Sequence, residues 1–314
     1  MCSTGTRIIG SGYVDGVTEA EIIAALTRPS ARARVGIGDD GAVLDDGTVI
    51  TVDTMVEGRH WDDKLTPADV GWKLVAVNAS DLGAMGARPS WALLSLALPD
   101  PVDRAWLDAF RAGLYEALDH FRIELIGGDT VSAPIRVLTL TAGGHADHPV
   151  LRSTARPGDD IWVTGQLGLA AEGFLSSHPS PAARAALARP PPPVALGLAL
   201  AQARLPTAMM DLSDGLRLDL ARLCVASAVS ADIDADAIPG VPDLAWRVAF
   251  GEDYQLLFTA PPAGRSAIGA LSHAHGVVST RIGTITPTAP GGDHTARLLG
   301  VDWPDSLFEH FHRG

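Results

Sequence analysis

The chain has 314 residues, which is long enough for two domains of ordinary size. Hydrophobic residues make up 46% of it and charged residues 19%, so it can bury a sizeable core and is not a disordered chain. Its formal net charge is −13 at pH 7, and it carries no basic stripe of the kind that nucleic-acid-binding proteins use. No apolar run approaches the ~20 residues of a membrane span, and the N-terminal residues lack the apolar stretch of a secretory signal. We therefore expect a cytoplasmic protein without nucleic-acid or membrane partners.

Alternating strand and helix patterns organise the first half of the chain. The run Val49 to Val56 is typical of a buried strand, which Asp53 interrupts. Thr66 and Pro67 indicate a helix start, with threonine as N-cap and proline in the first turn. The apolar spacing of this helix continues towards Met85. The further predicted elements are a strand at 91–98, an amphipathic helix at 101–121 and short strands at 124–126 and 136–141.

A change of composition separates the two halves. Residues 143–149 are rich in glycine and histidine, and we predict a linker there. Residues 176–193 are rich in serine, alanine and proline, which favours a surface loop. The predicted elements of the second half are strands at 161–164, 209–212, 231–233 and 254–259, and helices from residue 167 and over 216–226. The pattern predicts two α/β domains, 1–148 and 149–314.

Five short segments place aspartate beside glycine or at the end of a strand. They are residues 36–40, 51–53, 78–81, 127–130 and 211–215. Aspartate oxygens are hard ligands that suit Mg²⁺, which keeps water or phosphate oxygens as its other ligands. Each segment alone is also explained by a turn or a helix cap. However, the aspartates of 51–53 and 78–81 interrupt apolar segments, where a surface turn is a poor explanation. Because carboxylates in one place repel one another, such a cluster needs cations.

Other motifs argue against several classes of site. The P-loop pattern is absent and neither lysine, Lys64 or Lys73, follows a glycine. Any ATP chemistry must therefore use metals, backbone amides and arginine. No G-x-S-x-G motif supports a serine hydrolase. His145 and His148 are better explained as part of a solvated loop than as a zinc site. Residues 232–236 are better explained as an alternating strand than as a calcium-binding loop.

Seven motifs, in this order and spacing, carry a resemblance to a known family. They are GIGDDGAVL (36–44), TVDTMVEGRHW (51–61), WKLVAVNASDLGAMGARP (72–89), LIGGDT (125–130), RSTARPGDDIWVTGQLG (152–168), DLSDGL (211–216) and GEDYQLLFT (251–259). Over nearly its whole length the sequence resembles the thiamine-monophosphate kinases, which make thiamine diphosphate from thiamine monophosphate and ATP. These kinases belong to the aminoimidazole ribonucleotide synthetase-like superfamily. The resemblance implies a two-domain α/β (α+β) fold, in which the N-terminal mixed sheets of a homodimer pair and the C-terminal α/β domain completes the substrate site.

The resemblance also implies roles for individual residues. Several Mg²⁺ ions would be held by Asp39, Asp40, Thr51, Asp53, Asp81, Asp129, Asp211 and Asp214. Of these, the residues that act in catalysis through the metals would be Asp53, Asp129 and Asp214. The residues that contact ATP would be Phe121, Gly128, Arg152 and Ser213. The thiamine substrate would contact His60, Glu252 and a C-terminal aromatic residue, with Phe308 as the best match and Trp303 or Phe311 as alternatives.

Three positions depart from the family's pattern. Val52 stands where the metal-binding strand commonly has threonine, so any metal contact there must come from the backbone. Phe250 stands where a second glycine is common, which would alter the substrate loop, and Gln255 replaces a usual glutamate.

The implied reaction needs no general base. The acceptor is a phosphate monoester, whose second pKa is about 6, so it is already an anion near pH 7. The barrier is repulsion between two anions, which metal ions and arginine reduce. We therefore expect direct in-line transfer without a phosphoenzyme. The alternatives are another ATP-dependent synthetase of the superfamily and a non-catalytic nucleotide- or metal-sensing relative, and the retained carboxylates disfavour the second.

Overall fold

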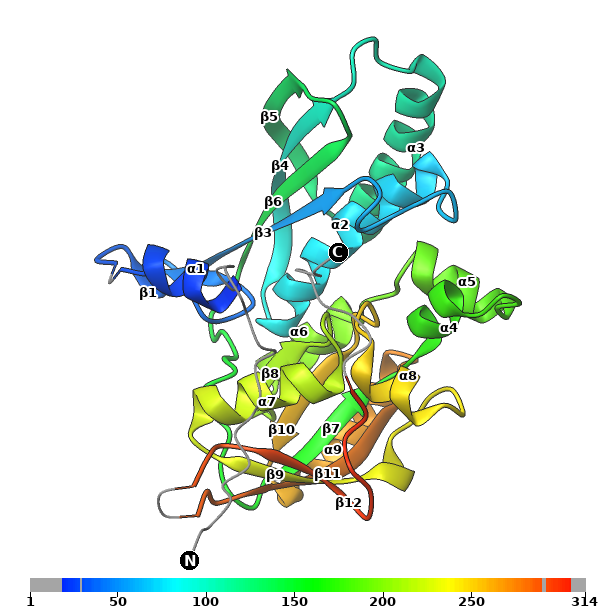
Figure 1. Cartoon of the computed structure of the whole chain (residues 1–314). Helices are drawn as coiled ribbons and strands as arrows, with labels where there is room; N and C mark the ends of the chain where they lie inside the picture. Colours follow the sequence, from blue (N-terminus) through cyan, green and yellow to red (C-terminus); the bar gives the residue numbers. More distant parts are fainter. Residues whose placement is uncertain (1–18, 29, 290–291, 306–314) are drawn as a thin grey trace, which may run out of the picture.

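The chain folds into two α/β units, each built around a six-stranded sheet (Figure 1). The computed structural model describes residues 19–28, 30–289 and 292–305. In these ranges no helix has the length and apolar character needed to cross a membrane. The predicted architecture of two mixed α/β units is confirmed. The predicted domain limits, 1–148 and 149–314, stay a prediction.

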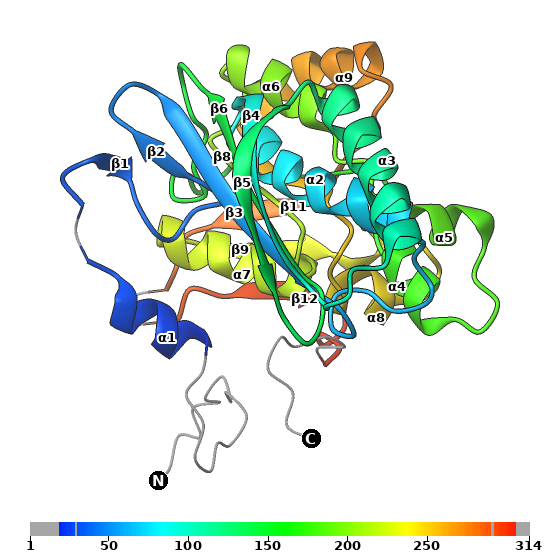
Figure 2. The same ribbon diagram turned by 90° about the horizontal axis from the view of Figure 1, so that it is seen from above.

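The first sheet has the strand order β1-β2-β3-β6-β4-β5 and is mixed, because β4 and β5 run parallel while the other neighbours are antiparallel. Its strands are β1 (Ala33–Val35), β2 (Ala42–Leu44), β3 (Thr48–Val56), β4 (Arg88–Leu98), β5 (Glu124–Ser132) and β6 (Val137–His145). The helices of this unit are α1 (Glu19–Leu26), α2 (Pro67–Ala84) and α3 (Arg104–Phe121). Helices α2 and α3 cover one face of the sheet (Figure 2).

Side-chain alternation along the strands separates a covered face from an open face of the first sheet. On β3, Val49 and Met55 are buried against the helices, whereas Val52 between them is 58% exposed. Leu93 on β4 and Val131 on β5 are 39% and 54% exposed. One face of this sheet therefore exposes apolar side chains that no helix of the described residues covers.

The predicted start of α2 is confirmed and has a clear local cause. Thr66 Oγ1 accepts the backbone N–H of Asp69 at 3.2 Å, and the Asp69 carboxylate accepts the backbone N–H of Thr66 at 3.2 Å. This reciprocal capping box satisfies two donors that a helix leaves unpaired at its N-terminus. Pro67 follows at a position where no N–H is needed.

The second sheet has the order β12-β9-β11-β7-β10-β8, with β12 parallel to β9 and the other neighbours antiparallel. Its strands are β7 (Asp160–Thr164), β8 (Ala208–Asp211), β9 (Ser230–Asp234), β10 (Leu256–Ala260), β11 (Ser279–Thr286) and β12 (Ala296–Leu299). Its helices are α4 (Leu169–Leu175), α5 (Pro181–Ala188), α6 (Val194–Gln202), α7 (Leu216–Ser227), α8 (Leu244–Ala249) and α9 (Arg265–Ala274), with short 3₁₀ turns at Ala235–Ala237 and Pro262–Gly264. Helix α7 packs in the core on one face of this sheet, and α6 and α9 pack in the core on the other.

The two units meet where the end of α2 packs against α6 and β8. A Cβ on Gly197 of α6 would lie only 2.3 Å from the backbone oxygen of Gly83 on α2. A Cβ on Gly83 would in turn lie 3.0 Å from the Cα of Val194. The helices therefore touch backbone to backbone, and Ala84 at the end of α2 joins the core of the second unit.

Two sequence predictions are wrong. Residues 176–193 are not one loop, because α5 begins at Pro181 behind Ser180, whose Oγ accepts the N–H of Ala183 at 3.2 Å. Residues 143–145 belong to β6 and not to a linker. Glycine occurs in this strand because a Cβ on Gly143 would lie 2.2 Å from the Trp91 ring across the ladder.

We expect Gly197→Ala to lower the free energy of unfolding by about 1–3 kcal/mol, because the added methyl forces α6 away from α2. Urea denaturation followed by circular dichroism measures this change. Gly269→Ala is the matched control, since Gly269 also lies inside a helix but a Cβ there meets nothing within 4 Å. The control should be neutral or slightly stabilising. Equal stability of the two variants would contradict a backbone contact between α2 and α6.

Candidate active site

Three carboxylates from separate segments converge where α2 meets β8. Asp40 lies between β1 and β2, Asp81 lies near the end of α2, and Asp211 is the last residue of β8. One oxygen of each lies within 4.8 Å of the other two. In the described part of the chain, this is the group of side chains that approach closely enough to share a metal ion. We call these three residues the aspartate cluster.

Neighbouring side chains orient the aspartate cluster. Thr51 Oγ1 donates to Asp81 Oδ2 at 2.6 Å, and Ser80 Oγ donates to Asp211 Oδ2 at 2.6 Å. Asp53 follows Thr51 by two residues on β3, so both side chains face the side of the sheet that α2 covers. The sequence predictions for Thr51, Asp53, Asp81 and Asp211 thus fall in one place, although no contact among them is local in sequence.

Burial and mutual repulsion make the aspartate cluster costly to ionise. Burial, then the neighbouring carboxylates, raise the pKa of Asp81 well above its usual range. Burial also raises the pKa of Asp40, against the opposing effect of Arg152. Burial is the main cause that raises the pKa of Asp211 to about 7. A cation in the cluster would offset this repulsion.

Arg152 ties the aspartate cluster to the segment that joins the two units. Its backbone N–H donates to Asp39 Oδ2 at 3.2 Å, and its guanidinium pairs with Asp40. Asp40 Oδ2 is buried without a hydrogen-bond partner in the described residues. An unpartnered carboxylate oxygen beside two further carboxylates fits a hard divalent cation, which takes oxygen ligands.

A cavity of about 200 Å³ opens beside the aspartate cluster, between the two units. It is lined by residues of α2, β3 and β8 and of the loops 213–214 and 252–254. The charged or polar residues among them are Asp53, Thr54, His60, Lys73, Asp81, Asp211, Ser213, Asp214, Glu252 and Tyr254. The structure therefore brings four of the predicted metal residues, Asp53, Asp81, Asp211 and Asp214, into one cavity with the predicted substrate residues His60 and Glu252.

Backbone hydrogen bonds hold the two cavity loops of the second unit together. Glu252 N–H donates to Ser213 O at 2.8 Å, and Tyr254 N–H donates to Leu212 O at 2.9 Å. A Cβ on Gly251 would lie 2.0 Å from Ser213 O, so only glycine permits this approach. The preceding residue, Phe250, is buried beside Phe174, with ring centroids 5.9 Å apart. Apolar packing therefore accommodates the phenylalanine that stands where the family commonly has a second glycine.

The ring orientation of His60 follows from one backbone contact. The N–H of Val56 donates to His60 Nδ1 at 3.0 Å. Because Nδ1 accepts this hydrogen bond, the neutral ring carries its proton on Nε2. The ring lines the cavity and can offer Nε2–H as a donor there.

A second ion-pair network surrounds Asp214, and sequence analysis missed its other members. Arg222 on α7 pairs with Asp214 and, at 2.8 Å, with Asp219 Oδ1. Asp219 Oδ2 accepts the N–H of Asp214 at 3.0 Å. Burial, then repulsion from Asp214, raise the pKa of Asp219 to about 8. The signal in the sequence was an aspartate and an arginine three residues apart on one face of an otherwise apolar helix.

Four residues that were predicted to bind lie apart from the aspartate cluster or outside the described residues. Asp129 lies opposite Ser95 in the ladder, and Ser95 lies opposite Thr139, so these three side chains point to the same face of the first sheet. That face is the open one, and Asp129 is exposed on it. Gly128 lies beside it, where a Cβ would lie 1.8 Å from Leu94 O. Phe121 is buried at the end of α3, beside another cavity of about 720 Å³. Phe308, like the alternative Phe311, falls outside the described residues.

Two other positions have local roles. Trp303 packs against the second core and donates its Nε1–H to Ala296 O at 2.8 Å. Gln255 Oε1 accepts the hydroxyl of Thr164 at 2.9 Å inside the second sheet. Val52 points to the open face of the first sheet, so its departure from threonine leaves the cavity lining unchanged.

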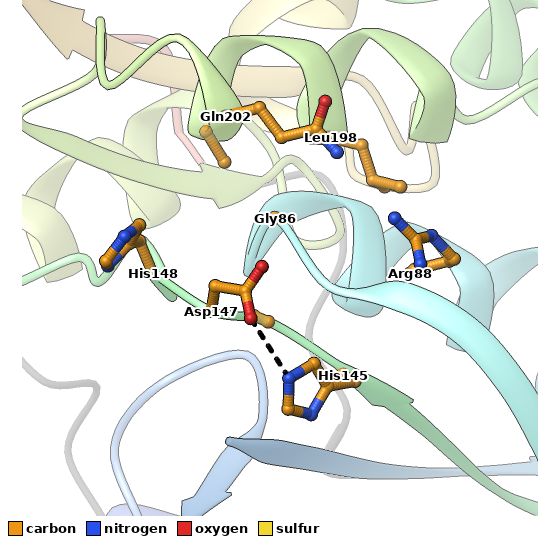
Figure 3. A pocket seen from close by; sticks show the side chains of 9 residues that line it. Gly86, Arg88, His145, Asp147, His148, Leu198 and Gln202 are labelled. Atoms are coloured by element: carbon orange, nitrogen blue, oxygen red, sulfur yellow. Dashed lines mark hydrogen bonds and ion pairs between the residues drawn. The ribbon is translucent and has the colours of Figure 1, made fainter.

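The histidines of 145–148 border a different cavity, of about 280 Å³ (Figure 3). His145 contacts Asp147 at 3.3 Å, and both side chains are largely exposed. His148 contacts the guanidinium of Arg204. Neither histidine belongs to the group of possible metal ligands found among the described residues.

Family models match both units. Residues 38–146 match the N-terminal domain, and residues 156–292 the C-terminal domain, of the AIR synthase related proteins. A thiamine-monophosphate kinase of Escherichia coli O157:H7 is 40% identical over 307 residues, which cover 88% of this chain and 92% of that protein. The chain belongs to the thiamine-monophosphate kinase family. The resemblance in the sequence motifs is thereby confirmed.

Solved structures of the thiamine-monophosphate kinase family share this fold. The crystal structure of the enzyme from Stenotrophomonas maltophilia K279a has a TM-score of 0.73 and 36% identity, and covers 85% of this chain and 91% of that one. A structure described as AaThiL complexed with AMPPCP and TMP has a TM-score of 0.73 and 27% identity, and covers 85% and 90%. Both of these family members support the arrangement of two α/β units seen here.

We expect Asp211→Asn to stabilise the metal-free protein more at pH 8 than at pH 5. The folded protein holds the Asp211 pKa at about 7, whereas an unfolded aspartate ionises near 3.9. The folded state therefore binds the extra proton, and stability falls as pH rises between these values. Asparagine does not ionise, so the difference from wild type should reach roughly 1–3 kcal/mol at pH 8.

Urea denaturation in a chelator at both pH values measures the effect of Asp211→Asn. Asp236→Asn, on an exposed aspartate, is the control and should not change the pH dependence. An Asp211→Asn variant that is less stable than wild type at pH 8 would contradict the repulsion argument.

Proposed function

We propose that this chain transfers the γ-phosphoryl group of ATP to thiamine monophosphate, giving thiamine diphosphate and ADP, in a reaction that needs Mg²⁺. The observation that carries the proposal is the aspartate cluster, formed by both units, beside a cavity that also holds His60 and Glu252. Relatives with the name thiamine-monophosphate kinase cover most of the chain, and one solved relative is described with AMPPCP and TMP. The expected cytoplasmic location stays a prediction.

The residues that would hold Mg²⁺ are the aspartate cluster with Asp53, Asp39, Asp214, Asp129 and the Thr51 hydroxyl. Bound Mg²⁺ would neutralise the phosphate oxygens of donor and acceptor. Arg152 lies beside Asp39 and Asp40, where its guanidinium can turn to the phosphates of ATP once cations occupy the carboxylates. Ser213 would bind phosphate oxygens of ATP through its hydroxyl, and Gly128 through its backbone. Phe121 would contact the nucleotide.

Acceptor recognition would use the opposite wall of the cavity. His60 offers Nε2–H, and Glu252 offers a carboxylate that suits an N–H donor or a cation of the thiamine moiety. Phe308 would pack on the same moiety. No side chain needs to remove a proton, because the acceptor phosphate is already ionised. The chain's own contribution is to hold two anions in line.

We expect the wild-type chain to form thiamine diphosphate from ATP and thiamine monophosphate only when Mg²⁺ is present. Asp53→Asn should lower kcat at least about 100-fold with the fold kept, because it removes a ligand charge without changing volume. Product resolved by chromatography gives the rate, and circular dichroism the fold. Asp236→Asn should keep full activity. A wild type that binds ATP but makes no product would favour another superfamily synthetase or a sensing role.

We also propose that the chain forms a homodimer through the open face of the first sheet. This face exposes Val52, Leu93 and Val131, and soluble proteins rarely leave such apolar patches uncovered. Figure 2 shows that α2 and α3 lie only on the other face. Pairing there would also remove Asp129 from solvent, where a carboxylate needs a cation or donors. That requirement supports Asp129 as a metal ligand in the assembled protein.

We expect Val52→Arg to convert the dimer to a monomer, because two arginines would be buried at the paired faces. Light scattering after size-exclusion chromatography measures the mass. Val225→Arg is the control, since Val225 is 61% exposed on α7 and outside the open face. A wild type that is monomeric at all concentrations, or a Val52→Arg protein that stays dimeric, would contradict this interface.

A further inference from the structure

Lys73 is a buried cation at the wall of the candidate active site. It is one of only two lysines in the chain, and its side chain is 1% exposed. It lies on α2, lines the cavity, and its ammonium pairs with Glu252 Oε2. The other lysine, Lys64, is 45% exposed. A fully buried ammonium is tolerated only with a partner, so the Glu252 carboxylate is what permits Lys73 here.

The conformation of Glu252 is held from both units. Its backbone has φ 69°, in the left-handed region that non-glycine residues seldom adopt. Its N–H donates to Ser213 O at 2.8 Å in the second unit, and its carboxylate pairs with Lys73 of the first unit. The surrounding structure therefore imposes this backbone conformation, which is a feature of residues that must be precisely placed.

We propose that Lys73 is a positioning residue for acceptor recognition, which acts through Glu252. Its ammonium fixes Oε2, so that Oε1 is presented to an N–H donor or the cationic ring of the acceptor. This inference rests on the proposed function, because it assumes that thiamine monophosphate enters the cavity.

The charges around the cavity explain why Glu252 needs this partner. Asp53, Asp81, Asp211 and Asp214 line the same cavity. A fifth carboxylate adds to their mutual repulsion, and the ammonium of Lys73 offsets this repulsion by pairing with Glu252.

The geometry argues against direct binding of phosphate by Lys73. Its ammonium is buried and already paired with the Glu252 carboxylate. If the ammonium turned to a phosphate, Glu252 would remain unpaired beside four aspartates. The exposed guanidinium of Arg222 and the cluster-bound Arg152 are better placed for that role.

A double-mutant cycle tests the inference. The variants are Lys73→Met, Glu252→Gln and the combination of both, compared with wild type. Lys73→Met should raise KM for thiamine monophosphate by about tenfold, which is the loss expected for one charge-assisted contact. The kcat and the KM for ATP should stay within about twofold, because the phosphoryl groups are bound elsewhere. In the Glu252→Gln background, Lys73→Met should change no constant by more than about twofold.

Three results would overturn the inference. The same tenfold effect in both backgrounds would mean that Lys73 acts on the acceptor directly. A loss confined to kcat or to the KM for ATP would place Lys73 with the phosphoryl-transfer residues. An unchanged KM for thiamine monophosphate in Lys73→Met would mean that Lys73 has no positioning role. Lys64→Met is the control and should match wild type. If Lys73→Met does not fold, Lys73→Gln replaces it in the same cycle.

Calorimetric binding of thiamine monophosphate, with Mg²⁺ and AMPPCP present, separates this inference from the proposed function. A wild type that binds the acceptor but makes no product contradicts the proposed function. The double-mutant cycle is then evaluated from the Kd for thiamine monophosphate in place of its KM. Normal wild-type turnover without coupling between Lys73 and Glu252 overturns only the inference. A wild type that binds no acceptor overturns both.

Discussion

The backbone contact between α2 and α6 is the constraint on which the site depends. Gly83 and Gly197 let the two helices meet without side chains between them. Helix α2 thereby belongs to both cores, since it packs on the first sheet and its end reaches the second. Asp81 on α2 and Asp211 on β8 approach each other only because of this contact. A shift of α2 by the width of one methyl group would separate ligands that must share a cation.

The site is built at a cost in stability that bound ligands can recover. Buried carboxylates repel one another, and the fold holds them together by packing elsewhere. Cations and nucleotide that bind only the folded chain would stabilise it by mass action. The same preorganisation serves phosphoryl transfer, because oxygen ligands are already aimed at the positions where charge must be neutralised.

Both units contribute side chains to the cavity. Of the residues that line the cavity, the first unit supplies Asp53, Asp81, Lys73 and His60, and the second supplies Asp211, Asp214 and the loop that holds Glu252. Lys73 and Glu252 form an ion pair across this boundary, so one contact joins the two units at the cavity wall. The face of the first sheet that points away from the cavity is where we propose that a second copy binds.

Local signals in the sequence were sufficient for α2, β3 and most of the central elements, because capping residues and apolar periodicity act within a few residues. The same signal, Ser180 before Pro181, was present at α5 but was overlooked within a proline-rich stretch. The motifs also identified the family and the aspartates of the cluster, since short segments carry the ligand types. Only the tertiary structure decided which of them meet: it joined Asp40, Asp81 and Asp211, set Asp129 on the opposite face, and buried Lys73 against Glu252. The contact between Thr51 and Asp81 spans 30 residues of chain and that between Lys73 and Glu252 spans 179. Such contacts depend on strand register and helix packing, for which no local pattern exists.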